Sequence, residues 1–251
     1  MIRRKTAREI EQMRAAGRIA AAARQMAGEL VKVGATTHSI DRKIYSFIIS
    51  QGAAPTFLGY NGFPASACIS VNEQVIHGIP SQRRLANGDV VSIDIGATKN
   101  GYVGDCAATF VAGESSPEAA RLIKVTRQCF FEGLKYARVG FRVSDISRAV
   151  QNFAERHGYS LVREYVGHGV GAKMHEPPEV PNFVQIPRVK ADPRLISGMT
   201  IAVEPMVNAG VPDIKILKDG WTVVTADGKM SAHYENTILI TDGDPEILTV
   251  C

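Results

Sequence analysis

The sequence predicts an α+β fold in which paired helices precede an antiparallel sheet, and in which this arrangement occurs twice. Three observations predict it: capped helices come before short apolar strands in each half of the chain, segment 88–94 (GDVVSID) aligns with 198–204 (GMTIAVE), and 105–113 (DCAATFVAG) aligns with 235–243 (ENTILITDG). Only two copies are present, which excludes a solenoid. We therefore expect one domain over residues 1–251, duplicated as approximately 1–113 and 114–251 about a pseudo-twofold axis.

Four helices are predicted from their start signals. Thr6 and Glu9 form a capping box ahead of an apolar repeat with helical spacing, and Thr37 can cap a second helix. In the second half, Ser116 is followed by proline, the preferred residue at the first helical position. The fourth helix is expected over 144–157. Each half thus begins with two helices.

The strands are predicted from short apolar runs bounded by turn residues. Asn100 and Gly101 lie between two of these runs and indicate a tight hairpin. The expected strands cover residues 67–71, 90–95, 107–111, 200–203, 222–225 and 237–241.

Composition limits the classes of function. The chain has 251 residues, 45% of them hydrophobic and 22% charged, so it can bury a large core. It has no apolar run near the roughly 18 residues of a membrane span and no signal peptide, and the four scattered cysteines indicate reduced thiols; we expect no membrane contact and a cytoplasmic location. The net charge of +4 is concentrated near the N-terminus, where it indicates a solvated helix face or, alternatively, contact with ribosomal RNA.

Four carboxylates occupy related positions in the two halves. Folding the hairpin at Asn100 brings Asp94 and Asp105 opposite or nearly opposite each other in apolar surroundings, where like charges need a compensating cation. The duplication adds Glu204 and Glu235 at the corresponding positions. Each of these residues alone could be a turn or strand-end charge, but together they form the ligand set of a divalent metal pair.

A histidine refines the choice of metal. His168 lies between glycines in the segment that separates the two carboxylate pairs. An imidazole ligand shifts the preference from magnesium or calcium to manganese, iron, cobalt or zinc.

Nearly the whole chain resembles the type I methionine aminopeptidases, which have the pita-bread fold. The resemblance rests on the motifs VNEQVIHGIP (71–80), DVVSIDIGATKNGYVGDCAATF (89–110), GHGVGAKMHEPPEVPNF (167–183), MTIAVEPMVNAG (199–210) and KDGWTVVTADGKMSAHYENTILIT (218–241). It implies removal of the initiator methionine from nascent polypeptide N-termini, with preference for a small second residue, by a compact bacterial-type enzyme.

The resemblance also implies metal-binding roles for five residues. Asp94 would chelate one divalent ion, His168 and Glu204 the other, and Asp105 and Glu235 would bridge the pair. A water between the metals would be the nucleophile, and Glu204 would carry its proton to the leaving amine.

Further residues are implied in substrate binding. His77 and His175 would line the cleft without binding metal, and His175 would hydrogen-bond the scissile amide or its oxyanion. The methionine pocket would include Tyr60, Phe63, Cys68 and Trp221.

Two positions depart from the familiar family pattern, and others carry weaker expectations. Phe63 stands where tyrosine is common, and Met174 stands where phenylalanine often precedes the cleft histidine, so the pocket should differ in shape. Asn72 and Ser231 match positions that hold a structural monovalent cation in some members. No catalytic role is expected for the remaining histidines, His38, His157 and His233.

Two alternatives differ in activity. One is a proline-specific aminopeptidase or prolidase of the same fold, although those usually carry an extra N-terminal domain. The other is a non-enzymatic binding protein on this fold, which would be expected to have lost metal ligands. We expect a monomer, with ribosome association as a possible partnership and no recognition of a specific nucleic acid sequence.

Overall fold

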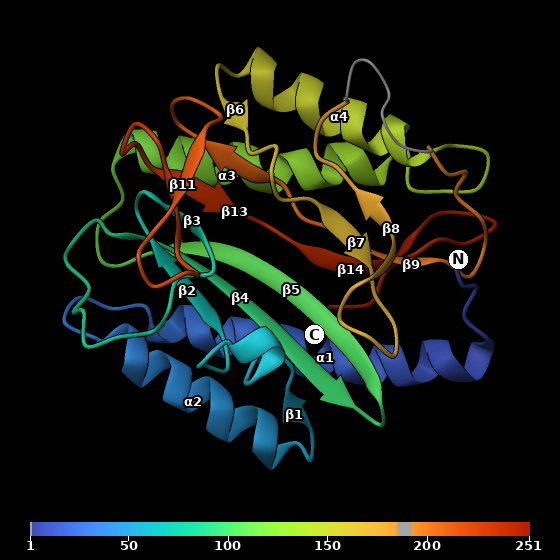
Figure 1. The fold of residues 1–251 in the computed structure, drawn as a ribbon, viewed down its shortest axis with the longest axis horizontal. Helices are drawn as coiled ribbons and strands as arrows, with labels where there is room; N and C mark the ends of the chain where they lie inside the picture. The colour runs from blue at the N-terminus through green and yellow to red at the C-terminus, as the bar shows by residue number, and fades with distance from the viewer. Residues whose placement is uncertain (1, 185–191) are drawn as a thin grey trace.

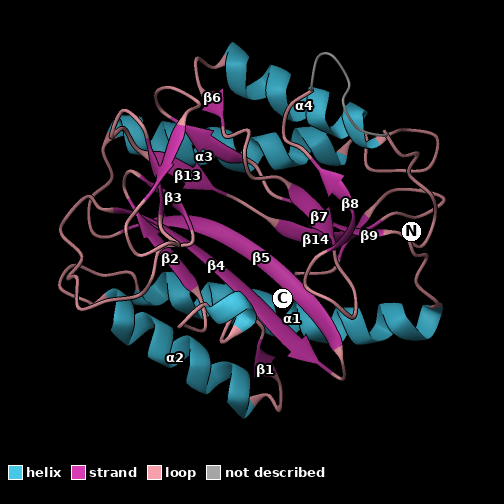
Figure 2. Cartoon of the chain, in the orientation of Figure 1, coloured by secondary structure: helices cyan, strands magenta, loops and turns pink. Residues whose placement is uncertain are grey.

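The computed structural model describes residues 2–184 and 192–251. Two helix pairs lie on opposite sides of a central body of strands (Figure 1). The helices are α1 (Ala7–Leu30), α2 (Thr37–Ser50), α3 (Pro117–Leu134) and α4 (Val143–Arg156), with a short 3-10 turn, η1 (Tyr60–Gly62). Colouring by secondary structure shows the helices on the outside and the strands between them (Figure 2).

The strands form antiparallel ladders throughout the described chain. In the first half they are β1 (Ala54–Pro55), β2 (Cys68–Val71), β3 (Gln74–Ile76), β4 (Val90–Lys99) and β5 (Tyr102–Val111). In the second half they are β6 (Ser160–Leu161), β7 (Gly167–Gly169), β8 (Glu176–Val180), β9 (Thr200–Val203), β10 (Met206–Asn208), β11 (Ile214–Ile216), β12 (Val223–Thr225), β13 (Ser231–His233), β14 (Asn236–Leu239) and β15 (Glu246–Ile247).

Two sheets carry the architecture. One has the order β1-β4-β2 with β5 paired to β4, and the other has the order β15-β14-β9-β7-β8. Helices α1 and α2 share an apolar core with the first sheet, and α3 and α4 share one with the second. The predicted α+β class with antiparallel sheet is confirmed. The internal duplication stays a prediction, which the same order of elements in both halves supports.

The helix starts follow local capping chemistry. The Thr6 side chain accepts a hydrogen bond from Glu9 N at 3.3 Å while Glu9 accepts from Thr6 N at 2.7 Å, which is the predicted capping box. The Ser116 hydroxyl accepts from Ala119 N at 3.1 Å, again as predicted.

Two predicted helix starts each shift by one residue. The cap of α2 is Thr36, whose hydroxyl accepts from Ser39 N, so Thr37 is already helical. Helix α4 begins at Val143 rather than at residue 144, because the Asp145 carboxylate accepts from the Arg142 amide and closes the first turn earlier.

Helix α1 lies unusually close to strand β5. Gly17 on the helix faces Gly104 on the strand, and a Cβ added at Gly104 would lie 2.5 Å from Gly17 Cα. No side chain fits between the two backbones. This contact sets the distance between the helix and the strand that carries Asp105.

The long hairpin that carries two of the predicted site residues turns where expected. Lys99 pairs with Tyr102, so Asn100 and Gly101 form a two-residue loop, and both have positive φ. Such a loop matches the twist of the flanking strands. The strands themselves extend further toward the loop than the apolar runs predicted, because pairing continues through the polar residues next to the turn.

Candidate active site

Asp94 and Asp105 lie on the same face of the β4–β5 hairpin. The ladder pairs Asp94 with Ala107 and Gly96 with Asp105, so the two aspartates are offset by two positions rather than directly opposed. Side chains two positions apart along a strand point to the same side of a sheet. The hairpin therefore directs both carboxylates toward the second half of the chain.

Glu204 and Glu235 lie at the end of the ladder between β9 and β14, in the second half of the chain. Strands β9 and β14 pair up to Val203 and Asn236, and the glutamates are the next residue beyond this pair on each strand. Main-chain bonds between Glu235 and Ala107, at 3.0 and 3.3 Å, attach this ladder to β5. The connection brings all four carboxylates to the place where the two sheets meet.

Each of the four carboxylates has one buried oxygen without a hydrogen-bond partner, although Asp94 and Glu204 as whole residues are only half-buried. Asp105 and Glu235 are both 1% exposed. Asp94 Oδ1, Asp105 Oδ1, Glu204 Oε1 and Glu235 Oε1 have no hydrogen-bond partner among the described residues. Buried carboxylates are normally paired or bound to cations, so the cluster fits a multivalent cation site.

Burial and mutual repulsion change the acidity of the whole cluster. Burial raises the pKa of Asp94 to about 7. Burial first, and the neighbouring carboxylates second, raise the pKa values of Asp105, Glu204 and Glu235 well above the ordinary range. Without cations the site therefore opposes full ionisation, and it would favour positive charge placed among these oxygens.

His168 adds a neutral nitrogen that faces the same point. Its Nδ1 bonds the Gly169 carbonyl oxygen at 2.9 Å, so Nδ1 carries the proton and Nε2 carries a lone pair. Burial lowers the pKa of His168 to about 4, which keeps the ring neutral at pH 7. Nε2 lies 3.6 Å from Asp105 Oδ2 and 3.5 Å from Glu204 Oε1. A lone pair directed at two carboxylates is repulsive unless a cation lies between them.

The donor atoms of this cluster match a transition metal. One donor atom each from Asp105, His168 and Glu235 lies within 4.8 Å of the others. A mixed imidazole and carboxylate set suits manganese, iron, cobalt or zinc. The fixed Nδ1 bond is also the arrangement in which proteins present a histidine to a metal.

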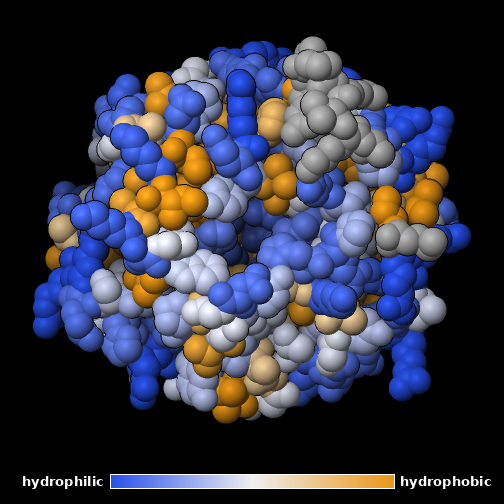
Figure 3. Space-filling model, viewed as in Figure 1, coloured by the Kyte–Doolittle hydropathy of each residue, from blue (hydrophilic) through white to orange (hydrophobic). Residues whose placement is uncertain are grey.

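A cavity of about 270 Å³ opens above the cluster, and every predicted site residue lines it. The face shown in Figure 3 is hollowed near its centre, over the region between the two helix pairs. The volume of the cavity is close to the lower end of the roughly 300–1,000 Å³ found for ligand pockets. The lining residues other than the four carboxylates and His168 are Phe57, Tyr60, Asn61, Phe63, Cys68, Ile76, His77, Tyr165, Val166, Met174, His175 and Trp221.

Two histidines stand beside the acidic cluster. His175 Nδ1 bonds the Tyr60 hydroxyl at 2.7 Å, and its ring centre lies 4.2 Å from that of His168. His77 has a positive φ of 58°, and its ring packs edge-on against Tyr165 at 5.3 Å. Burial lowers the pKa of both rings, that of His77 to about 4, so both are neutral at pH 7.

The chain matches the model of metallopeptidase family M24 over residues 11–242. The chain belongs to family M24. Among curated proteins, the methionine aminopeptidase of Clostridium acetobutylicum is 52% identical over 244 residues, which cover 97% of this chain and 96% of that protein. The resemblance found in the sequence is confirmed.

Solved structures support the fold of this M24 chain. The crystal structure of methionine aminopeptidase from Rickettsia prowazekii has a TM-score of 0.96 at 40% identity, with 100% of both chains covered. The prolidase from Pyrococcus furiosus has a TM-score of 0.78 at 23% identity and shows the shared fold, with 99% of this chain matched to 65% of the prolidase. The predicted pita-bread fold is confirmed.

The apolar wall of the M24 cavity includes residues that the sequence alone did not single out. Phe63 and Trp221 pack edge-to-face at 5.1 Å, and Cys68 pairs across the ladder with Asp94. Phe57, Ile76, Tyr165 and Val166 complete this wall. They lie in loops or short strands with no periodic pattern, so no sequence signal identified them.

His233, which lies two residues before Glu235 in the sequence, is close to the acidic cluster. It is fully buried, and its Nε2 lies 3.8 Å from Glu204 Oε2. The pairing of β13 with β10 explains this, because it places His233 opposite Met206, two residues after Glu204. His38, by contrast, is exposed, and His157 Nδ1 bonds Phe153 O on α4.

The two residues expected to hold a monovalent cation, Asn72 and Ser231, are in direct polar contact. Ser231 N donates to Asn72 O at 2.9 Å, and the Asn72 side chain bonds Asp89 and Val90 N. The two residues are thus neighbours, and the cation itself stays a prediction.

Proposed function

We propose that this chain removes the N-terminal methionine of other polypeptides as a metal-dependent aminopeptidase. Membership of a metallopeptidase family and full-length identity to methionine aminopeptidases support this activity. The observation that carries it is the convergence of His168 Nε2 with four partly unpartnered carboxylates at the floor of a small apolar cavity.

Five side chains would hold two divalent ions in this proposal. Asp94 would hold one ion, His168 and Glu204 the other, and Asp105 and Glu235 would bridge them. Bound there, cations of cobalt, manganese, iron or zinc would act as Lewis acids that polarise the scissile carbonyl and acidify the attacking water.

His175 would stabilise the charge that develops on the scissile carbonyl oxygen. The Tyr60 hydroxyl lies 2.7 Å from His175 Nδ1, and a phenol that donates there leaves the ring proton on Nε2. The low pKa of the ring keeps it neutral, so Nε2 can donate a hydrogen bond without adding a charge. His77, which also lines the cavity, would contact the same part of the substrate.

Glu204 would move the proton between the attacking water and the leaving amine. Its Oε1 has no hydrogen-bond partner in the described chain, so this atom is available as the acceptor. A carboxylate with an elevated pKa is suited to carrying a proton near neutral pH.

The cavity wall would select methionine. Phe63, Trp221 and Cys68 surround an apolar space, and aromatic edges make favourable contacts with a thioether sulfur. The acidic floor would attract the substrate's free α-amine, which explains cleavage at the N-terminus. A cavity of about 270 Å³ leaves little space past the first residue, so we expect a small second residue.

Cleavage of matched peptides by the metal-loaded protein tests the proposal. We expect release of methionine from Met-Ala-Ser and none of the N-terminal residue from an Xaa-Pro peptide, with the activity lost after chelation and restored by added metal. Cleavage of only the proline bond would support the prolidase alternative. Absence of any cleavage with metal bound would support a non-enzymatic binding protein.

The setting in which the enzyme acts is part of the same proposal. We infer that its substrates are nascent chains in the cytoplasm, and that it works as a monomer near the ribosome. Among the described residues, no helix combines the length and apolar character needed to cross a membrane. Ribosome association and the monomeric state stay predictions.

A further inference from the structure

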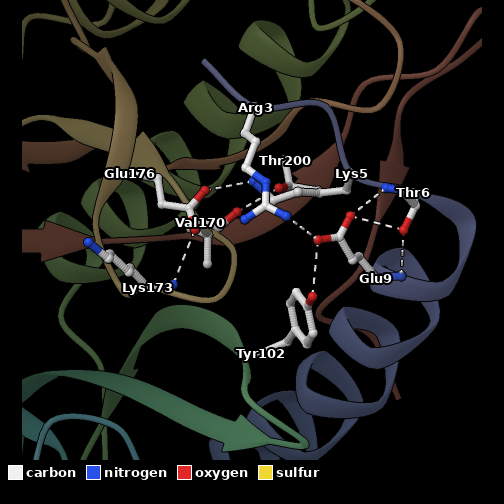
Figure 4. A network of polar contacts seen from close by, with 9 residues as sticks. All are labelled: Arg3, Lys5, Thr6, Glu9, Tyr102, Val170, Lys173, Glu176 and Thr200. Atoms are coloured by element: carbon white, nitrogen blue, oxygen red, sulfur yellow. Dashed lines mark hydrogen bonds and ion pairs between the residues drawn. The ribbon is translucent and has the colours of Figure 1, made fainter. Parts of the chain in front are cut away.

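The segment before α1 is attached to the loop that leads into β8. Lys5 has a side chain only 3% exposed, and its Nζ lies 2.7 Å from Glu176 Oε2 (Figure 4). Its backbone amide also donates to Gly198 O at 2.7 Å. Lysine is almost never buried this deeply without a partner. The ion pair therefore joins the N-terminal segment to a loop more than half the chain away.

Glu176 also organises its own loop. Its second oxygen, Oε1, accepts from the Lys173 amide at 3.1 Å, so the carboxylate closes the turn between residues 173 and 176. A Cβ at Gly171 would collide with Glu176 Oε1 and lie 2.6 Å from Lys5 Cε. The turn is thus wrapped directly around the ion pair, with no space for another side chain.

The start of this loop is attached to two neighbouring strands. Val103 N donates to Gly171 O at 2.9 Å, and the Thr200 hydroxyl donates to Val170 O at 2.6 Å. These bonds hold residues 170 and 171 in place. The far end of the loop, which carries His175, is attached at Glu176, whose main chain pairs with Gly169 in the β7–β8 ladder. The Glu176 side chain is held by Lys5 (Figure 4).

His175 and Glu176 are consecutive residues with opposite environments. Successive side chains of an extended segment point to opposite sides. His175 faces the cavity, where it bonds Tyr60, while Glu176 faces the buried ammonium of Lys5. A change in the position of the Glu176 carboxylate would therefore rotate or displace the imidazole on the other side of the backbone.

The ion pair has the strength needed to fix this position. Although burial opposes ionisation, the hydrogen bonds from Lys5 and the Lys173 amide lower the pKa of Glu176, so the carboxylate is charged at neutral pH. Removing one partner of a buried pair leaves an uncompensated charge that must move toward water. Here such a movement would carry the loop with it.

We propose that Lys5 is a positioning residue for His175, and that it acts through Glu176 to hold the imidazole against the substrate. The inference rests on the proposed aminopeptidase activity. The N-terminal segment then contributes to the active site from outside the cavity, although it contributes no side chain to the cavity lining.

Three variants of the full-length protein separate positioning from general stability. Lys5→Met removes the charge and keeps the length of the side chain, and Lys5→Arg restores a cation. The control is Arg14→Met, which breaks another long-range ion pair: Arg14 Nη2 lies 2.7 Å from Glu246 Oε2, in a contact between α1 and β15 away from the cavity.

For the metal-loaded enzyme we expect Lys5→Met to lower kcat by about 10- to 100-fold with KM changed much less, as misplacement of a catalytic group does. Lys5→Arg should recover most of the loss, and Arg14→Met should retain wild-type kcat. Metal content should be the same in all variants. An equal fall in kcat for Arg14→Met, or a Lys5→Met variant with lower Tm but normal kcat, would overturn the inference.

A second readout does not depend on turnover. The His175 ring signals in an NMR spectrum of the metal-free protein, assigned with His175→Gln, should shift in Lys5→Met and return in Lys5→Arg. If Lys5→Met does not fold, Glu176→Gln provides the same test from the other partner. Failure of the wild type to cleave Met-peptides would reject the proposed function, whereas active wild type with unchanged variants would reject only the positioning role.

Discussion

Ala107 N donates a hydrogen bond to Glu235 O at 3.3 Å, and Glu235 N donates one to Ala107 O at 3.0 Å. The pair lies where the hairpin of the first half meets the ladder of the second half. Ala107 is also the residue opposite Asp94, so one main-chain contact places carboxylates from both halves side by side. Neither half can build the acidic cluster alone, and the following predictions test what the cluster does.

Removing one donor of the cluster should abolish metal binding at low cost to the fold. For Asp105→Asn and for His168→Ala we expect loss of bound metal, measured by elemental analysis, and loss of Met-peptide cleavage, with an unchanged circular dichroism spectrum. Asp242→Asn makes the same change at an exposed position and should behave as wild type. Full activity in either site variant would contradict the assignment of the metal centre.

The metal-free protein should become less stable as the pH rises. Burial raises the pKa of Asp94 to about 7, and those of Asp105, Glu204 and Glu235 also lie above their unfolded values. A raised folded-state pKa gives stability that is complete below the unfolded pKa of about 4 and is lost as the pH rises through the folded pKa. The Tm of the chelated protein should therefore fall between pH 5 and pH 8.

Added divalent metal should remove this dependence, because it compensates the ionised carboxylates. Thermal unfolding in the presence and absence of chelator across this pH range provides the measurement. At about 1.4 kcal/mol per pKa unit, the difference at pH 8 should reach a few kcal/mol. A chelated protein whose Tm is constant or rises with pH would count against uncompensated burial.

Replacing His175 should affect turnover while leaving metal bound. His175 lines the cavity beside His168, and in the proposed mechanism it donates to the developing oxyanion. For His175→Ala we expect kcat to fall by roughly 10²- to 10³-fold, the usual effect of removing one such donor. Steady-state kinetics with metal analysis checks this, and loss of metal in the variant would instead make His175 a ligand.

Thr237 should support Asp105 through its hydroxyl. Thr237 Oγ1 accepts from Asp105 N at 3.1 Å and donates to Asp105 O at 2.9 Å, and both groups are buried. Thr237→Val leaves them unpartnered, so we expect a loss of about 1–3 kcal/mol in the free energy of unfolding and weaker metal binding.

Thr98→Val provides the matched control for this loss. It removes a hydroxyl that bonds Thr56 at 2.8 Å, toward the turn of the same hairpin. Calorimetric titration of the two variants with metal should show weaker binding only for Thr237→Val. Equal affinities would show that the hydroxyl contributes to folding alone.

Local chemistry explains which parts of the fold could be predicted from the sequence. Thr6 with Glu9, Ser116 with its following proline, and Asn100 with Gly101 form their structures through neighbouring residues, so each was predicted at the correct position. Strands such as β7, β10 and β13 have three residues each and are held by partners distant in the chain. A segment that short has no periodicity to detect.

The same distinction between local signals and long-range contacts applies to the candidate site. The five proposed ligands were found because the two halves repeat a carboxylate pattern and because the motifs resemble a known family. Phe57 and Tyr165 reach the cavity only through tertiary packing, and His233 approaches Glu204 because β13 pairs with β10. The ion pair between Lys5 and Glu176 joins residues 171 positions apart, so the sequence around either residue could not predict it.

The close packing of helix α1 at Gly17 limits how this enzyme can be engineered. Glycine within a helix costs about 1 kcal/mol relative to alanine, so a designer seeking heat resistance would replace Gly17 first. A methyl group on Gly17 would collide with the main-chain carbonyl of Leu248, so either the helix or the C-terminal segment would have to move. A more thermostable variant would therefore have to keep Gly17 and gain its stability from substitutions elsewhere in the chain.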